Sequence, residues 1–128
     1  MGLEQTVTFP SGGVPSWPAV RDLLGRHGFA VQLRMIDGEL AFPDEEPPPS
    51  WHELRLGTPQ GMVTLRREAD RVDLVVWGNA DAGLRQAWNA LTWACAEAGG
   101  GEVLAAGRSL PAGEFRGTAE LPEGLRKT

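Results

Sequence analysis

The strongest constraint on the fold is a regular alternation of apolar and polar residues in the middle of the chain. Such alternation is typical of half-buried β-strands. It predicts three consecutive strands, at 51–57, 62–68 and 71–77. With "TPQG" as the first turn and "AD" as the second, one register aligns Leu54, Leu65 and Leu74 in a single apolar row. The three segments therefore predict an antiparallel sheet with one buried face.

The opposite side of these strands supports the same register. Glu53 faces Arg66 there, and Arg66 faces Asp73. Acidic and basic residues directly opposite each other on neighbouring strands stabilise a sheet. Because both faces agree, we expect one face to be buried and the other to be open, with charged residues at its middle.

An Asp-Gly turn predicts a further hairpin earlier in the chain. The segment "VQLRMI-DG-ELAF" (31–42) places alternating residues on both sides of Asp-Gly, which is the strongest short-range hairpin signal. Counting outward from the turn places Leu33, Met35, Leu40 and Phe42 on one side. We expect that side to be buried.

Two helices flank this group of strands in the sequence. The first follows an N-cap at Ser16 or Trp17 and ends before Gly28. The second begins after an N-cap at Asp81 and stops at "GGG" (99–101).

With a strand at 5–9 before the first helix, the element order is β-α-β-β-β-β-α. This order predicts an α+β fold, with an antiparallel β-sheet of about five strands and two helices packed on one face. Over roughly residues 5–98 the order resembles the TBP-like or helix-grip arrangement in topology, which implies no activity. We expect 1–107 to form a single α+β domain and 108–128 an irregular C-terminal tail packed on its surface.

The charge balance narrows the class of partner. The chain has 128 residues, 12 of them basic and 17 acidic, for a formal net charge of −5. Duplex nucleic-acid binders usually carry a basic surplus, so we expect no duplex nucleic-acid partner. No run approaches the ~20 apolar residues of a membrane span, and no signal peptide is evident. Together with a single cysteine, Cys95, these features predict a cytoplasmic protein without a membrane partner.

Two tryptophans of the second helix cannot both face the sheet. Trp88 and Trp93 lie five residues apart, which places them roughly 140° apart around a helix. We assign Trp88 to the core. Trp93 then needs another cover, and three are open: the C-terminal tail through Phe115 or Leu121, a partner subunit, or solvent.

The open sheet face and Trp93 form a candidate protein interface. Tryptophan, methionine and arginine are enriched in such interfaces, and these residue types fall on the predicted surface. The candidate interface residues are Trp51, Arg55, Met62, Trp77 and Trp93. Two alternatives remain: a solvated sheet face, and stacking of single-stranded RNA, which Glu53 and Asp73 disfavour.

A second set of residues occupies positions that are expected to face the buried side of the sheet. These residues mark a candidate small-molecule pocket between the sheet and the helices. The set comprises His27, His52, Arg67 and Cys95. Histidine and cysteine serve nucleophilic catalysis or metal binding when they converge. Each also has an ordinary role, His27 near a helix C-terminus, His52 at a strand start and Cys95 as a buried apolar residue. The charge of Arg67 either reaches water or binds an anionic ligand.

No motif in the chain defines a catalytic site. The loop "SGGVPS" (11–16) lacks the spacing of a phosphate-binding loop, and the carboxylates at 44–46 lie in a Pro-rich segment that offers no burial. We therefore assign no catalytic, cofactor-binding or metal-ligating residue. We expect a small acidic protein that is not an enzyme and acts through protein–protein contacts, as a homodimer or as a regulatory or immunity-type partner-binding protein. The alternative is a small-molecule-binding protein or enzyme that uses the pocket.

Overall fold

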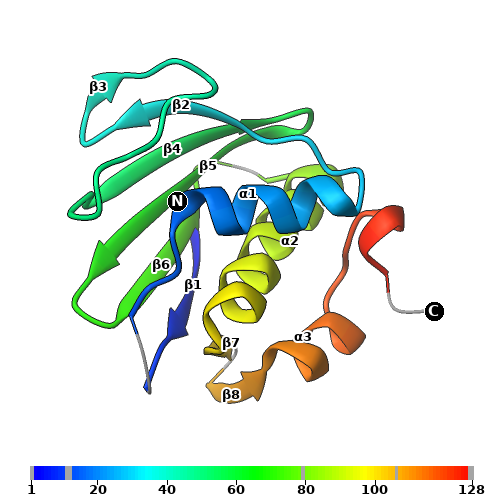
Figure 1. Cartoon of the computed structure of the whole chain (residues 1–128). Helices are drawn as coiled ribbons and strands as arrows, with labels where there is room; N and C mark the ends of the chain where they lie inside the picture. Colours follow the sequence, from blue (N-terminus) through cyan, green and yellow to red (C-terminus); the bar gives the residue numbers. More distant parts are fainter. Residues whose placement is uncertain (1, 11–12, 79, 106, 127–128) are drawn as a thin grey trace.

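The chain folds into one antiparallel sheet with helices packed on one of its faces (Figure 1). The computed structural model describes residues 2–10, 13–78, 80–105 and 107–126. The strands are β1 (Leu3–Thr8), β2 (Gln32–Ile36), β3 (Glu39–Leu40), β4 (Glu53–Thr58), β5 (Gly61–Glu68), β6 (Arg71–Val76), β7 (Glu102–Ala105) and β8 (Arg108–Pro111). The helical segments are α1 (Trp17–Arg26), α2 (Ala82–Gly99), α3 (Ala112–Thr118) and the 3-10 turn η1 (Glu123–Leu125).

Within the described residues the sheet has eight strands, in the order β3-β2-β4-β5-β6-β1-β7-β8. Every neighbouring pair is antiparallel. The predicted α+β class with one antiparallel sheet is confirmed, whereas the predicted number of about five strands is too low. The short strands at the two ends of the sheet make most of the difference. The likeness to TBP-like folds stays a prediction.

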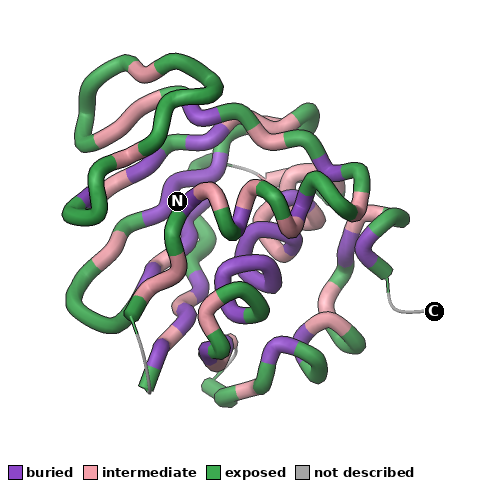
Figure 2. Tube along the Cα trace, in the orientation of Figure 1, coloured by how far each residue is buried: buried purple, intermediate pink, exposed green. Residues whose placement is uncertain are grey.

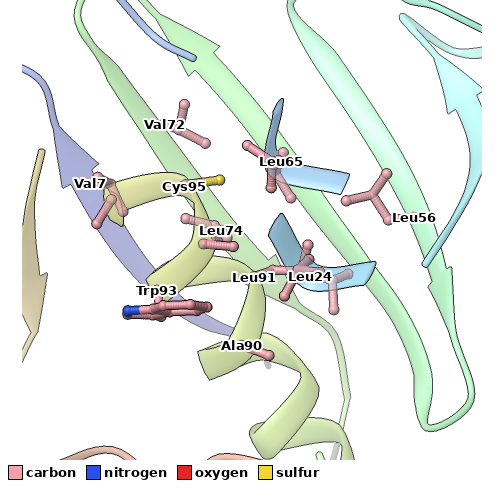
Figure 3. Packing of buried hydrophobic residues seen from close by; sticks show 14 of the residues in the cluster. Val7, Leu24, Leu56, Leu65, Val72, Leu74, Ala90, Leu91, Trp93 and Cys95 are labelled. Atoms are coloured by element: carbon pink, nitrogen blue, oxygen red, sulfur yellow. The ribbon is translucent and has the colours of Figure 1, made fainter. Parts of the chain in front are cut away.

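The predicted register of β4, β5 and β6 is confirmed. Leu54 pairs with Leu65, which pairs with Leu74, and each of the three is at most 2% exposed. Figure 3 shows Leu65 and Leu74 beside Leu91 of α2. This apolar row is therefore the floor on which the helices pack.

The N-terminal strand lies inside the sheet rather than at its edge. Val7 of β1 pairs with Val72 of β6 on one side and with Val103 of β7 on the other. All three side chains are fully buried. β1 therefore joins the middle of the sheet to the C-terminal hairpin β7–β8.

A β-bulge in β2 changes which residues of the first hairpin are buried. Leu33 is fully buried, but the register between β2 and β4 shifts before Met35, which pairs with Arg55. A bulge sets two residues opposite one on the partner strand, so the alternation of faces is offset beyond it. As a result Ile36 packs against the core.

The predicted buried side of this hairpin is therefore wrong beyond Leu33. Leu40, which pairs with Met35, is 89% exposed, and Phe42 is 75% exposed. The sequence alternates regularly through the hairpin, and nothing in that pattern indicates the extra residue of the bulge.

Asp37 ties the turn of the first hairpin to the beginning of β4. Its backbone has a φ of 49°, in the left-handed region that an Asp-Gly turn requires. One carboxylate oxygen accepts backbone N–H bonds from His52 at 2.7 Å and from Glu53 at 2.8 Å. These two bonds lower the pKa of Asp37 below its usual value, because they favour the ionised carboxylate.

The two main helices begin and end at the capping residues that the sequence predicts. The hydroxyl of Ser16 accepts the backbone N–H of Ala19 at the start of α1. A carboxylate oxygen of Asp81 accepts the backbone N–H of Leu84 at 2.8 Å at the start of α2. Gly100, with a φ of +64°, ends α2 in the conformation that favours glycine.

The C-terminal segment is ordered and belongs to the same core. The expected irregular tail at 108–128 is instead built from β8, α3 and η1, and its last two residues lie outside the described part of the chain. Phe115, Leu121 and Leu125 are each at most 4% exposed. These three side chains therefore pack in the same hydrophobic core as the sheet and α2.

This segment covers Trp93, which is only 2% exposed. The guanidinium carbon of Arg116 lies 4.8 Å from the centroid of the Trp93 ring. His27, at the end of α1, packs edge-on against the same ring with 5.4 Å between centroids. Arg116 also donates to the backbone carbonyl of Leu125 at 2.8 Å, which ties η1 to α3. Of the three covers considered for Trp93, the structure has the C-terminal segment, together with α1.

α2 is the central helix of the molecule. Every residue from Ala90 to Ala96 is buried, so the middle of α2 is apolar and enclosed on all sides (Figure 2). The sheet covers one side, and α1 and α3 cover others. Among the described residues, no helix has both the length and the apolar character that crossing a bilayer requires.

We expect Trp93→Ala to lower the free energy of unfolding by about 3–5 kcal/mol, because it leaves a large cavity under the C-terminal segment. Trp77→Ala is the matched control: this tryptophan is 55% exposed, and its loss is expected to cost about 1 kcal/mol or less. Urea unfolding followed by far-UV circular dichroism measures both. Equal losses for the two variants would contradict the burial described here.

Candidate functional site

The candidate site is the sheet face turned away from α1 and α2, which we call the open face. The strand register orders its side chains into rows. One row consists of Leu40, Met35, Arg55, Thr64, Val75 and Glu4. The next row consists of Glu53, Arg66, Asp73, Thr6, Leu104 and Ser109. The strand register therefore determines which charged and apolar side chains lie next to each other across this face.

Arg66 and Trp77 cover the middle of the open face. The guanidinium carbon of Arg66 lies 5.2 Å from the centroid of the Trp77 ring, which is within cation–π range. Arg66 sits opposite Asp73, so its side chain must cross the row of Thr64 and Val75 to reach Trp77. Thr64 and Val75 are each only 3% exposed, although α1 and α2 lie on the other face. The Arg66–Trp77 pair therefore makes a small apolar patch with a cationic edge.

Glu53 joins two arginines at one side of this patch. Its carboxylate lies 3.3 Å from Arg66 and 3.5 Å from Arg55. Both arginine side chains are 46% exposed, so water screens these ion pairs and each contributes about 1 kcal/mol or less. Their main effect is to orient the arginines on the face.

The predicted row of Glu53, Arg66 and Asp73 is confirmed by the strand register. The two acidic residues of this row nevertheless form ion pairs with different arginines. Asp73 lies opposite Arg66, yet its ion pair is with Arg71 at 3.7 Å. It also accepts a hydrogen bond from the Thr6 hydroxyl at 2.7 Å. Glu4 in the neighbouring row has no cationic partner among the described residues.

Large apolar side chains remain exposed on the same face. Continuing the register two residues beyond the pair Thr64 and Val75 sets Met62 opposite Trp77, which directly follows β6. Trp77 is 55% exposed, Met62 44% and Leu104 42%. Three of the exposed large apolar side chains of the described chain therefore lie on the open face.

The five predicted interface residues divide into two groups. Arg55, Met62 and Trp77 lie on the open face, exposed as expected. Trp51 and Trp93 are 4% and 2% exposed and are withdrawn as interface residues. Remote segments bury them: the C-terminal segment covers Trp93, as described above. Arg67 and the Pro-rich loop before β4 enclose Trp51.

A cavity of about 490 Å³ lies between the start of α1 and the Pro-rich loop before β4. Its lining includes Val14, Pro15, Ser16, Trp17, Pro18, Glu46, Pro47, Pro48, Pro49, Trp51 and Arg67. The guanidinium carbon of Arg67 lies 4.6 Å from the Trp51 ring centroid, and Arg67 donates to the carbonyl of Pro49. Trp51 is thus enclosed by Arg67 and the proline rings rather than displayed on the open face.

One residue that lines this cavity has a buried polar atom without a partner in the described part of the chain. Trp17 is 2% exposed, and its indole nitrogen finds no hydrogen-bond acceptor in the described part of the chain. A buried donor without an acceptor costs about 1–3 kcal/mol. Sequence reasoning missed Trp17 as a site residue, because its position beside a helix cap says nothing of the distant loop that encloses it.

The residues predicted for a small-molecule pocket do not converge. Arg67 lines the cavity, and His52, whose backbone carbonyl accepts the Arg67 N–H at 2.7 Å, is exposed beside it. His27 instead packs against Trp93, and Cys95 lies in the core, where its sulfur points toward the central strands (Figure 3). In the described ranges, no group of three histidine, cysteine or acidic side chains is arranged to hold a metal ion.

The chain was compared with protein-family models, with curated proteins and with solved structures, and none of them matches it.

We expect Cys95 to resist thiol reagents while the protein is folded. Burial raises its pKa to about 12 from 9.0, because desolvation disfavours the thiolate, which is the reactive form. The pKa of Cys95 is higher in the folded protein than in the unfolded chain, so the buried neutral thiol favours the folded state. This contribution to the free energy of unfolding is fully present below pH 9 and is lost as the pH rises toward 12. The rate at which Ellman's reagent labels Cys95 at pH 8, with and without urea, measures this protection. Rapid labelling of the folded protein would contradict the burial of Cys95.

Proposed function

We propose that the protein is a non-enzymatic, cytoplasmic protein-binding module whose contact surface is the open face. The supporting observation is Trp77, a tryptophan that is 55% exposed and lies against the guanidinium of Arg66 on the open face. Tryptophan and arginine at the centre of a surface are the residue types that dominate binding energy in protein interfaces.

The charges on the face favour a protein over a nucleic acid as its occupant. Each arginine near Trp77 has a carboxylate nearby, with Glu53 against Arg55 and Arg66, and Asp73 one strand away. Carboxylates in these positions repel phosphate, whereas they match the mixed charges of a protein surface. A cytoplasmic location fits the single cysteine, which is buried in the core.

We expect Trp77→Ser to weaken binding of a protein partner by about 2 kcal/mol or more, the effect of losing a central anchor. The measurement is quantitative co-purification of the tagged chain from the cells that produce it, followed by titration of the recovered partner, whether another protein or a second copy. Phe42→Ser is the matched control, because Phe42 is 75% exposed but lies in the loop after β3. Complexes that survive Trp77→Ser unchanged, or no complex at all, would contradict the proposal.

A second function is favoured by one specific observation, the cavity lined by Trp17, Trp51 and Arg67. Its proline and tryptophan rings offer apolar walls, and Arg67 offers a cation. Pockets of this size with apolar walls and few polar groups are typical of small-ligand sites. Under this alternative the ligand is a small aromatic carboxylate.

We expect phenylacetate to shift the indole NMR signals of Trp17 and Trp51 if this second function holds. Arg67→Gln should abolish the shift, since it removes the cation that pairs with the carboxylate. Phenylacetamide is the neutral control ligand and should bind at least about tenfold more weakly. Equal responses to the acid and the amide would exclude the anion site.

A further inference from the structure

We propose that the open face binds a second copy of this chain, with a two-fold axis that runs parallel to the strands between β5 and β6. This inference rests on the proposed function and names its partner. It comes from the register of the sheet, which fixes where each side chain of the face would meet its counterpart.

Rotation about such an axis preserves the position of a residue along the strands and exchanges strands on opposite sides of the axis. β5 then opposes β6 of the partner, and β4 opposes β1 of the partner, given the order β4-β5-β6-β1. Residues in one row therefore face residues in the same row of the second copy. Two-fold pairs of this kind are the commonest form of homo-oligomer.

The row that contains Arg55 carries the decisive charge match. Arg55 in β4 and Glu4 in β1 belong to this row, at equal distances from the proposed axis. Each Arg55 therefore opposes Glu4 of the partner, twice per dimer. Glu4 has no cationic partner within the described chain, and because β4 and β1 are not neighbours, this match does not follow from pairing within the sheet.

The apolar residues match under the same rotation. Met62 opposes Trp77 of the partner, because continuing the register beyond the pair Thr64 and Val75 sets Met62 opposite Trp77, the residue after β6. The exposed surfaces of Met62 and Trp77 would thus cover each other. Arg66 also opposes Asp73 of the partner. This pair is weaker support, because Arg66 and Asp73 already lie opposite each other on neighbouring strands of one sheet.

The face approaches the size that a stable pair needs. The six strands from β2 to β7 lie about 4.8 Å apart; β1, β4, β5 and β6 are about 20 Å long and the shorter β2 and β7 about 13–16 Å, which gives roughly 500 Å² in projection. Specific dimers bury about 800 Å² per partner, and side-chain relief raises the accessible area above its projection. Twisted sheets pack face to face in this aligned manner.

The test uses the charge pair. The unmodified protein is expected to sediment as a dimer, and Arg55→Glu and Glu4→Arg are each expected to raise its dissociation constant at least about tenfold, because each variant sets like charges opposite each other twice. An equimolar mixture of the two variants should restore a dimer, since each arginine then opposes a glutamate. Arg26→Glu, an exposed change on α1, is the charge-matched control and should remain dimeric.

Three results would overturn the inference: a monomeric unmodified protein, a dimer that survives both variants, or no restoration in the mixture. If either variant fails to fold, mixed Glu4→Cys and Arg55→Cys chains replace it, and a bis-maleimide should join them; failure to cross-link overturns the pairing. A monomer that still forms Trp77-dependent complexes with another protein would remove the dimer alone, whereas loss of every Trp77-dependent complex would remove the proposed function.

Discussion

The packing of α2 against the apolar row of the central strands is the contact on which the rest of the structure depends. Leu65 and Leu74 form the floor of this contact, and Trp88 adds a polar tie by donating its indole N–H to the carbonyl of Leu74 at 2.8 Å. A second tie comes from Gln5, whose amide donates to Thr92 at 2.8 Å inside the interface. Once α2 is fixed in this way, its other sides receive α1 and α3. The helices therefore gather on one face of the sheet, and the opposite face is left open for other contacts.

Local patterns predicted the central part of the fold correctly, because its residues report on their immediate neighbours. The alternation through β4, β5 and β6 determines their register, and Asp81 and Gly100 mark the ends of α2 through hydrogen bonds within one turn. Long-range features were not predicted. The bulge in β2 comes from the fit to β4, and the order of the C-terminal segment comes from burial of Phe115 against distant parts of the chain. Neither leaves a periodic signal in the sequence.

The candidate site shows the same division. Parity along a strand is enough to place Arg55, Met62 and Trp77 on the open face, because side chains alternate between faces. Parity fails for Trp51, which precedes β4 and is enclosed by Arg67 and a proline loop. It fails again for Trp93, because a helix surface becomes core when a later segment packs on it. Whether a tryptophan outside a regular strand is buried depends on distant segments of the chain. The spacing of residues around the tryptophan does not show where those segments pack.

The insertion of β1 between β6 and β7 affects how the chain is made. β1 is synthesised before α1 and the other strands, whereas its partners Val72 and Val103 follow more than 60 residues later in the chain. Pairing of segments so far apart in sequence carries a large loop-closure cost and slows folding. Until β7 has been synthesised, one edge of β1 lacks its partner strand, so the sheet is completed only after that point. A chaperone that binds β1 during that interval would therefore protect the strand that later joins β6 to β7.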